Sequence, residues 1–251
     1  MPDESARAHA KRNSPDAPVR PPLAVGTLML ALGDSIAAGI GASHASEGCM
    51  AVLAAGLDPL CARLRLHNLA VPGETSASML APGGQLERAE EVLAAAARRD
   101  DIPGPVVLSI GGNDAMEAAL LGDDAARARL GDNLDTIFGR LAAALRPFSL
   151  RLDEVACVQT VYNPLHALAG NGDVPHTPDS IAPRRATRGS FNPIIREAAA
   201  RAGVRVAEVS RAFYGRGAEL TWVLSGDIHP SDSGHRLIAA VYADTCGWPH
   251  L

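Results

Sequence analysis

Four short segments of the sequence carry the residue types that acyl transfer requires. They are residues 33–35, 68–75, 111–114 and 225–230. Together they supply a serine hydroxyl, glycine amides, a carboxamide, a carboxylate and an imidazole. Acyl transfer needs a nucleophile, a base that takes its proton, a group that holds the base, and hydrogen-bond donors for the oxyanion. Ser35 is therefore the candidate nucleophile, provided that the fold brings the segments together.

The pattern of apolar residues predicts the elements that would position these segments. Short apolar runs predict five β-strands, at residues 27–32, 65–69, 105–110, 154–161 and 204–209. Amphipathic or apolar stretches between them predict helices at 47–63, 85–99, 123–146, 192–202 and after Ser231. Asn192 is expected to cap its helix, with Pro193 at the first helical position.

This alternation of strands and helices predicts a three-layer α/β/α sandwich with a five-stranded parallel sheet. In such sheets ligands bind outside the carboxyl ends of the strands. The four polar segments follow predicted strands, so we expect them to meet at that edge.

Composition limits the classes of function. The chain has 251 residues, 47% of them apolar and 20% charged, enough for one domain with a sizeable core. A net charge of −5 with scattered arginines argues against a nucleic-acid partner. The four cysteines form no Cys-x-x-Cys pair and the histidines have no ligand spacing, so we expect buried thiols and no metal or other cofactor.

The N-terminal residues 1–22 are rich in Pro, Arg, Asp and Ser and are expected to be a disordered leader, with a single domain at 23–251. Residues 23–32 resemble the apolar region of a signal peptide, but cleavage after them would remove the strand that supports Ser35. No run reaches the roughly 18 apolar residues that a transmembrane helix needs. The sequence therefore predicts a cytoplasmic protein without a transmembrane segment.

The four segments, in this order, closely resemble the conserved blocks of the SGNH hydrolases, also called the GDSL esterase/lipase family. The resemblance extends from residue 27 to about residue 243. It implies a flavodoxin-like fold, Ser35 as nucleophile and His229 as general base. It also implies that Gly73, Asn113 and the Ser35 amide bind the oxyanion. Members of the family hydrolyse carboxylic esters, lysophospholipids, thioesters and acetylated sugars, without a metal or organic cofactor.

The position of the aspartate departs from the family pattern. The family usually places it three residues before the histidine, where this chain has Gly226, and the nearest acid is Asp227. If residues 226–228 are extended, side chains at i and i+2 share a face and Asp227 can reach His229. Otherwise a backbone carbonyl orients His229 and the site is a Ser–His dyad. Both readings are open from the sequence.

The substrate is less constrained than the chemistry. Aromatic content of 4% argues against a stacking platform for polysaccharides, and short-acyl esters or lysophospholipid-like esters are the expected small-molecule substrates. The segment 163–189 is a candidate selectivity loop, because Arg184, Arg185 and Arg188 could attract an anionic head group. The alternatives are a non-catalytic acyl- or glycan-binding module on the same fold and a carbohydrate acetylesterase. The sequence does not determine the oligomeric state.

Overall fold

The computed structural model describes residues 22–61, 64–99, 101–121, 125–165 and 191–248. Its centre is a parallel sheet of five strands in the order β2-β1-β3-β4-β5. Their bounds are β1 Leu28–Gly33, β2 Arg65–Asn68, β3 Pro103–Ser109, β4 Ala156–Gln159 and β5 Arg205–Ala207. The predicted sheet is confirmed, and the order places β1 and β3 side by side in its middle.

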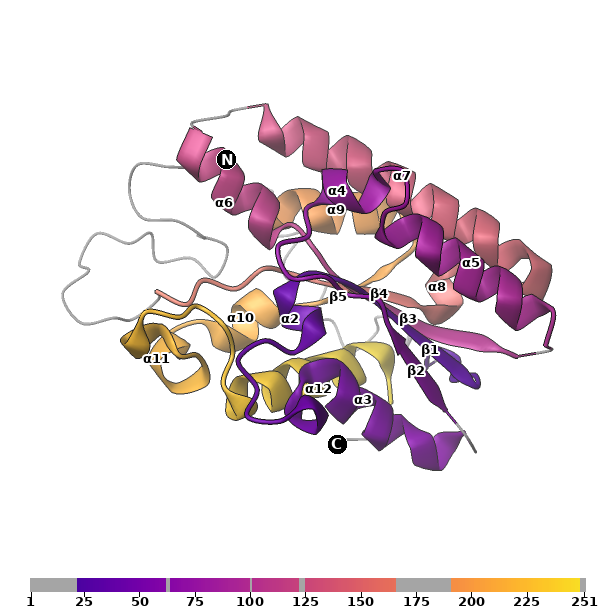
Figure 1. The fold of residues 1–251 in the computed structure, drawn as a ribbon, viewed down its shortest axis with the longest axis horizontal. Coiled ribbons are helices and arrows are strands. Elements are labelled where there is room, and N and C mark those ends of the chain that lie inside the picture. The colour runs from indigo at the N-terminus through magenta and orange to yellow at the C-terminus, as the bar shows by residue number, and fades with distance from the viewer. Residues whose placement is uncertain (1–21, 62–63, 100, 122–124, 166–190, 249–251) are drawn as a thin grey trace, which may run out of the picture.

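Helices cover both faces of the sheet (Figure 1). One layer comprises α4 (Ser76–Leu80), α5 (Gln85–Ala97), α6 (Gly112–Leu121), α7 (Ala126–Leu145), α8 (Leu152–Val155) and α9 (Asn192–Ala202). The other comprises α2 (Ser35–Ala38), α3 (Cys49–Leu57), α10 (Val209–Phe213), α11 (Gly217–Leu220) and α12 (Asp232–Cys246). Short 3-10 turns lie at η1 (Ala45–Glu47), η2 (Asp58–Leu60), η3 (Arg146–Phe148) and η4 (Val223–Ser225).

Burial explains why β1, next to the central strand, has an unbroken apolar sequence. Every residue of β1 is buried, as expected for a strand covered on both faces. Its side chains alternate between the two cores: Leu30 packs against the α5 and α7 layer, and Met29 against the α3 and α12 layer. The apolar stripe of α7, formed by Leu130, Leu134, Ile137, Leu141 and Leu145, is buried and packs onto the same sheet face as Leu30.

Two local expectations are wrong. The fourth strand begins at Ala156 rather than at 154, because Leu152 and Val155 are buried within the turn of α8. Asn192 does not cap α9. Its side chain instead bonds both the N–H and the carbonyl of Val161, at 2.8 and 2.9 Å, so it ties α9 to the loop after β4.

Among the described residues, no helix is both long enough and apolar enough to cross a membrane.

Candidate active site

The turn after β1 presents Ser35 at the carboxyl edge of the sheet. Gly33 has φ of +133°, and a Cβ there would lie 2.0 Å from the carbonyl oxygen of Ser109, so the close approach of β3 requires glycine. The Asp34 carboxylate caps α2 by accepting from the Ile36 N–H at 3.0 Å, and the Ser109 hydroxyl donates to it at 2.9 Å. Ser35 is thus the first residue of α2, and its N–H has no partner within that helix.

The imidazole of His229 lies between Ser35 and Asp227. Its Nε2 is 2.9 Å from Ser35 Oγ, and its Nδ1 is 2.5 Å from Asp227 Oδ1. An ionised carboxylate can only accept hydrogen bonds, so Nδ1 carries a proton and the Nε2 of a neutral ring accepts from the serine hydroxyl. The three side chains form a hydrogen-bonded row in the geometry expected of a nucleophile, its base and the group that orients the base.

Asp227 reaches His229 through a tight side-chain turn. Its Oδ1 accepts from the backbone N–H of His229 at 3.0 Å as well as from Nδ1, a turn typical of Asp bonding its own chain two residues on. Gly226 is left-handed, with φ 84° and ψ 7°, so Asp227 reaches His229 without the extended backbone at residue 226 on which the sequence made this contact conditional. The bond from the His229 N–H is the largest of the effects that lower the pKa of Asp227, and the carboxylate is ionised at neutral pH.

The loops after β2 and β3 bring Gly73 and Asn113 toward the same edge. Asn113, in the first turn of α6, donates one Nδ2 hydrogen to the carbonyl of Glu74 at 2.8 Å. The amide has a second hydrogen that this bond leaves free. Gly73 has φ of +85°, and an added Cβ would meet no described atom within 4 Å, so the peptide borders open space. The N–H groups of Ser35 and Gly73 and the Asn113 amide are the candidate oxyanion donors.

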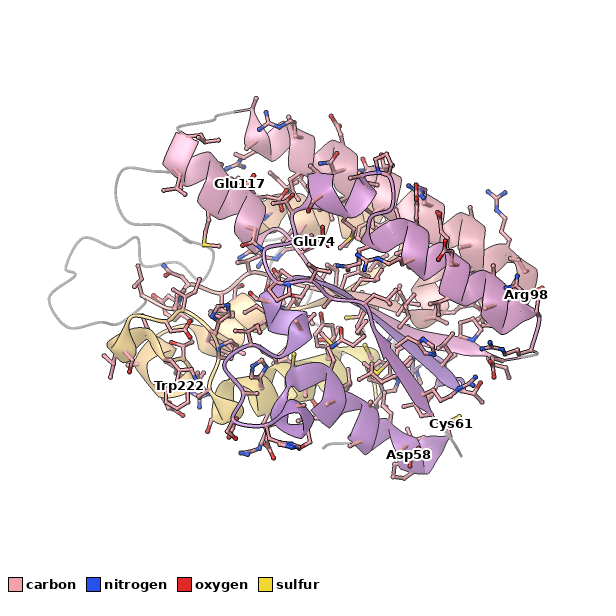
Figure 2. The ribbon with its side chains drawn as sticks, viewed as in Figure 1. Asp58, Cys61, Glu74, Arg98, Glu117 and Trp222 are labelled. Atoms are coloured by element: carbon pink, nitrogen blue, oxygen red, sulfur yellow. The ribbon has the colours of Figure 1, made fainter. Side chains whose placement is uncertain are left out.

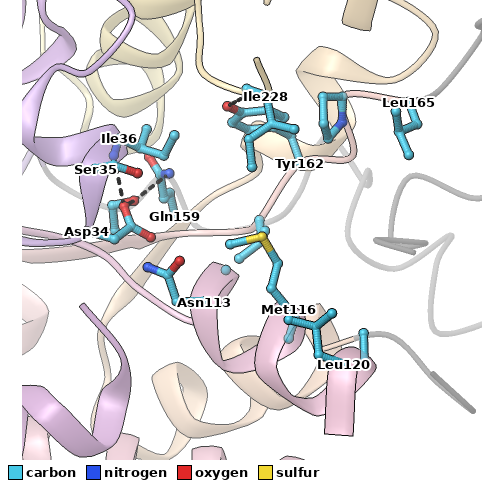
Figure 3. A pocket seen from close by; sticks show the side chains of 16 residues that line it. Asp34, Ser35, Ile36, Asn113, Met116, Leu120, Gln159, Tyr162, Leu165 and Ile228 are labelled. Carbon is cyan, nitrogen blue, oxygen red and sulfur yellow. Dashed lines mark hydrogen bonds between the residues drawn. The ribbon is translucent and has the colours of Figure 1, made fainter. Parts of the chain in front are cut away.

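A cavity of about 440 Å³ opens beside Ser35 (Figure 3). Its walls are mostly apolar, with Met116 and Leu120 one helical turn apart on α6 and facing Ile228 and Leu165. The remaining apolar lining residues are Ile36, Ala115, Ala119, Val161, Tyr162 and Pro164. Such a lining suits an alkyl chain.

Polar groups of the cavity lie on its sheet side. Gln159 donates to Ser109 Oγ at 2.9 Å, and Ser109 in turn donates to Asp34. Burial raises the pKa of Asp34 to about 6, against the opposing effect of the Ser109 bond. Asp34 makes its bonds within the turn, to the Ile36 amide and the Ser109 hydroxyl.

Comparison with known proteins identifies the family. The sequence matches the GDSL-like Lipase/Acylhydrolase family over residues 31–237. The chain belongs to this family. Searching curated protein sequences gave no match.

Solved structures similar to this GDSL-like protein share its fold. LAE5, an alpha/beta hydrolase enzyme from the metagenome of Lake Arreo, Spain, is 24% identical with a TM-score of 0.60, covering 89% of this chain and 96% of its own. TesA is 22% identical with a TM-score of 0.58, covering 87% and 97%. Axe2, an acetylxylan esterase from Geobacillus stearothermophilus, is 19% identical with a TM-score of 0.57, covering 91% and 98%.

Two parts of the candidate site of this GDSL-like protein differ between sequence and structure: three predicted residues are not described, and one cavity was not predicted. Arg184, Arg185 and Arg188 lie outside the described residues. Sequence reasoning missed the apolar cavity, although the i, i+4 spacing of Met116 and Leu120 on a helix was a usable signal. Within the described part of the chain, no group of three or more His, Cys, Asp or Glu side chains is arranged to hold a metal ion.

Proposed function

We propose that this protein is a serine hydrolase that cleaves small-molecule carboxylic esters with an apolar acyl group, through an acyl-enzyme intermediate on Ser35. One observation carries the proposal: the 2.9 Å contact between Ser35 Oγ and His229 Nε2, with His229 Nδ1 held by Asp227 at 2.5 Å. A serine hydroxyl is a weak nucleophile until a neighbouring base takes its proton. Membership of the GDSL-like family supports the same reaction class.

The proposed reaction has two halves. His229 Nε2 takes the proton of Ser35 as Oγ attacks the ester carbonyl, and Asp227 stabilises the imidazolium that forms. The negative charge that develops on the carbonyl oxygen is bound by the N–H groups of Ser35 and Gly73 and by the Asn113 amide. Collapse of this intermediate expels the alcohol, which takes the proton from His229. His229 then takes a proton from a water as the water attacks the acyl carbon. The bond to Ser35 Oγ breaks, Oγ takes the proton back from His229, and the carboxylic acid is released.

The cavity supports an alkyl chain as the acyl group. Its volume of about 440 Å³ is larger than an acetyl group fills, and its walls are mostly apolar. A carbohydrate acetylesterase, by contrast, needs polar groups for the sugar. We therefore propose alkyl esters, including lysophospholipid-like ones, as the substrate class, with the optimum above two carbons.

Two measurements test the proposal. A fluorophosphonate probe should label the folded wild-type protein stoichiometrically and leave Ser35→Ala unlabelled. A series of p-nitrophenyl esters from two carbons upward should show the highest kcat/KM above acetyl. If folded wild-type protein neither reacts with the probe nor hydrolyses any ester of the series, the site is that of an acyl-binding module without turnover. If p-nitrophenyl acetate has the highest kcat/KM of the series, the cavity is not the site that binds the acyl group.

A further inference from the structure

Gln85 is buried, and its side chain forms hydrogen bonds with Gly33, the last residue of β1. It begins α5 and is 0% exposed. Its Oε1 accepts from the N–H of Gly33 at 2.5 Å, and its Nε2 donates to the carbonyl of Gly33 at 2.9 Å. A reversed amide would set donor against donor and acceptor against acceptor, so the bonds fix its orientation. The side chain of Gln85 therefore pairs with the backbone of Gly33, beyond the point where β2 ends at Asn68.

The second Nε2 hydrogen of Gln85 binds Glu74, the residue after Gly73. This bond, to Glu74 Oε2, measures 2.8 Å. Glu74 is 6% exposed, and its other carboxylate oxygen accepts from the hydroxyl of Ser78. Figure 2 shows Glu74 in the interior, below α4 and close to the loops that leave the sheet. A buried carboxylate is costly unless both oxygens are bonded, as they are here.

The backbone of Glu74 completes the connection to the third candidate donor. Its carbonyl accepts from Asn113 Nδ2 at 2.8 Å. One chain of bonds thus runs from Gly33 through the side chains of Gln85 and Glu74 to Asn113. It joins the loops after β1, β2 and β3, each of which supplies one candidate oxyanion donor. The ends of β1 and β2 and the segments after them are also linked directly, by the bond from the Val71 N–H to the Gly33 carbonyl at 2.9 Å and by the bond from Asn68 Nδ2 to the Ala37 carbonyl at 2.7 Å.

We infer that Gln85 and Glu74 are positioning residues that hold the three oxyanion donors at their working separation. The inference rests on the proposed ester hydrolysis. Neither side chain is among those that line the cavity beside Ser35, so both act through Gly33, Gly73 and Asn113. Donors stabilise the transition state only where they meet the developing oxyanion, and a shift of about 1 Å can cost about 10²-fold. Supporting hydrogen bonds of this kind set such placement.

The first test replaces Gln85 with Met, which is similar in length but cannot make these bonds. The measurements are kcat and KM on a soluble p-nitrophenyl ester, with active sites counted by complete fluorophosphonate labelling. We expect Gln85→Met to lower kcat per active site by about 10- to 10²-fold, with KM within about threefold. An alkylboronic acid forms a tetrahedral anion on the serine, and its Ki should rise by a similar factor.

A conservative pair at Glu74 separates positioning from packing. In Glu74→Gln, the new Oε1 can accept from Gln85 and the new Nε2 can donate to Ser78 Oγ. The Ser78 hydroxyl hydrogen, which the wild type donates to Glu74, can then turn to the Thr75 carbonyl, 3.1 Å away. This variant should keep at least about half of the wild-type kcat, whereas Glu74→Met should lose about tenfold. If Gln85→Met fails to fold, Glu74→Met provides the same test, because it removes the next bond of the chain, from Gln85 Nε2 to Glu74, and Glu74→Gln is its control.

The control is Tyr242→Phe, which removes another buried bond to the sheet, from the Tyr242 hydroxyl to the Leu108 carbonyl at 2.6 Å. It should lower the unfolding temperature and leave kcat per active site unchanged. If Gln85→Met and Glu74→Met behave like this control, with normal kcat and boronate Ki, the inference is overturned while the proposed function stands. If the wild-type protein hydrolyses no ester, both fall together.

Discussion

Asp227→Asn tests how much a half-exposed carboxylate contributes to the reaction. The asparagine oxygen can still accept from the His229 N–H, so the turn should persist. What is lost is the charge opposite the imidazolium that forms when Ser35 gives up its proton. Two unit charges about 4 Å apart interact by about 1 kcal/mol in bulk water and about 4 kcal/mol at an effective dielectric near 20. The side chains of Asp227 and His229 are 47% and 23% exposed, which places the pair between these limits.

We expect a loss of about 3 to 4 kcal/mol, or about 10²- to 10³-fold in kcat, because the amide also favours the wrong imidazole tautomer. This is less than the roughly 10⁴-fold loss in a chymotrypsin-type triad, whose aspartate is buried. The assay is kcat at pH 7 per fluorophosphonate-titrated site. Asp232→Asn is the matched control, since it neutralises an exposed aspartate five residues away that bonds Ser43. Retention of more than half of the kcat by Asp227→Asn would mean that His229 works in a dyad.

Four further variants test the other assignments. Ser35→Ala and His229→Ala should each lower kcat/KM by about 10⁴-fold or more, and a folded variant with a tenth of the activity would contradict the mechanism. Asn113→Ala should lower kcat by about 10²- to 10³-fold with little change in KM; an effect confined to KM would make Asn113 a substrate-binding residue. Asp34→Asn tests the buried carboxyl: its pKa is raised from 3.8 to about 6, so its stabilising contribution is complete below pH 4 and is lost as the pH rises through 6. In urea titrations the unfolding free energy of Asp34→Asn relative to wild type should increase by up to about 3 kcal/mol between pH 4 and 8; a difference equal at both pH values would refute this.

The fold was predictable because its signals are repeated many times along the chain. The spacing of apolar residues in α7 and the unbroken apolar run of β1 each depend on many side chains that all face a core. Single-residue signals were weaker. Asn192 was predicted to cap a helix. Its side-chain amide instead makes two hydrogen bonds, one to the N–H and one to the carbonyl of Val161, whereas a capping side chain accepts a bond from the helix backbone.

The site was predictable in its residue types and only partly in its geometry. The positions of Ser35 and Asn113 after the ends of β1 and β3 follow from the topology, because parallel strands end at one edge. His229 does not directly follow a strand, since α10, α11 and η4 lie between β5 and its turn. The contact between Asp227 and His229 depends on the backbone of one turn, and a periodicity argument cannot supply that. The roles of Glu74 and Gln85 were also hidden, because each acts through bonds to distant backbone or side-chain atoms that leave no pattern in the sequence.

Two aspartates lie close to Ser35, and their surroundings separate their roles. Asp34 is buried, its pKa is raised, and its bonds go to the Ile36 N–H and the Ser109 hydroxyl within the turn. Asp227 is half-exposed, its pKa is lowered by the bonds from His229, and one of its oxygens touches the imidazole. A group that is to stabilise an imidazolium must already be charged at the working pH and must contact the ring. Asp227 meets both conditions, whereas Asp34 makes its bonds within the turn. In the mechanism that we propose, Asp34 therefore shapes the turn that carries Ser35, and Asp227 orients the base.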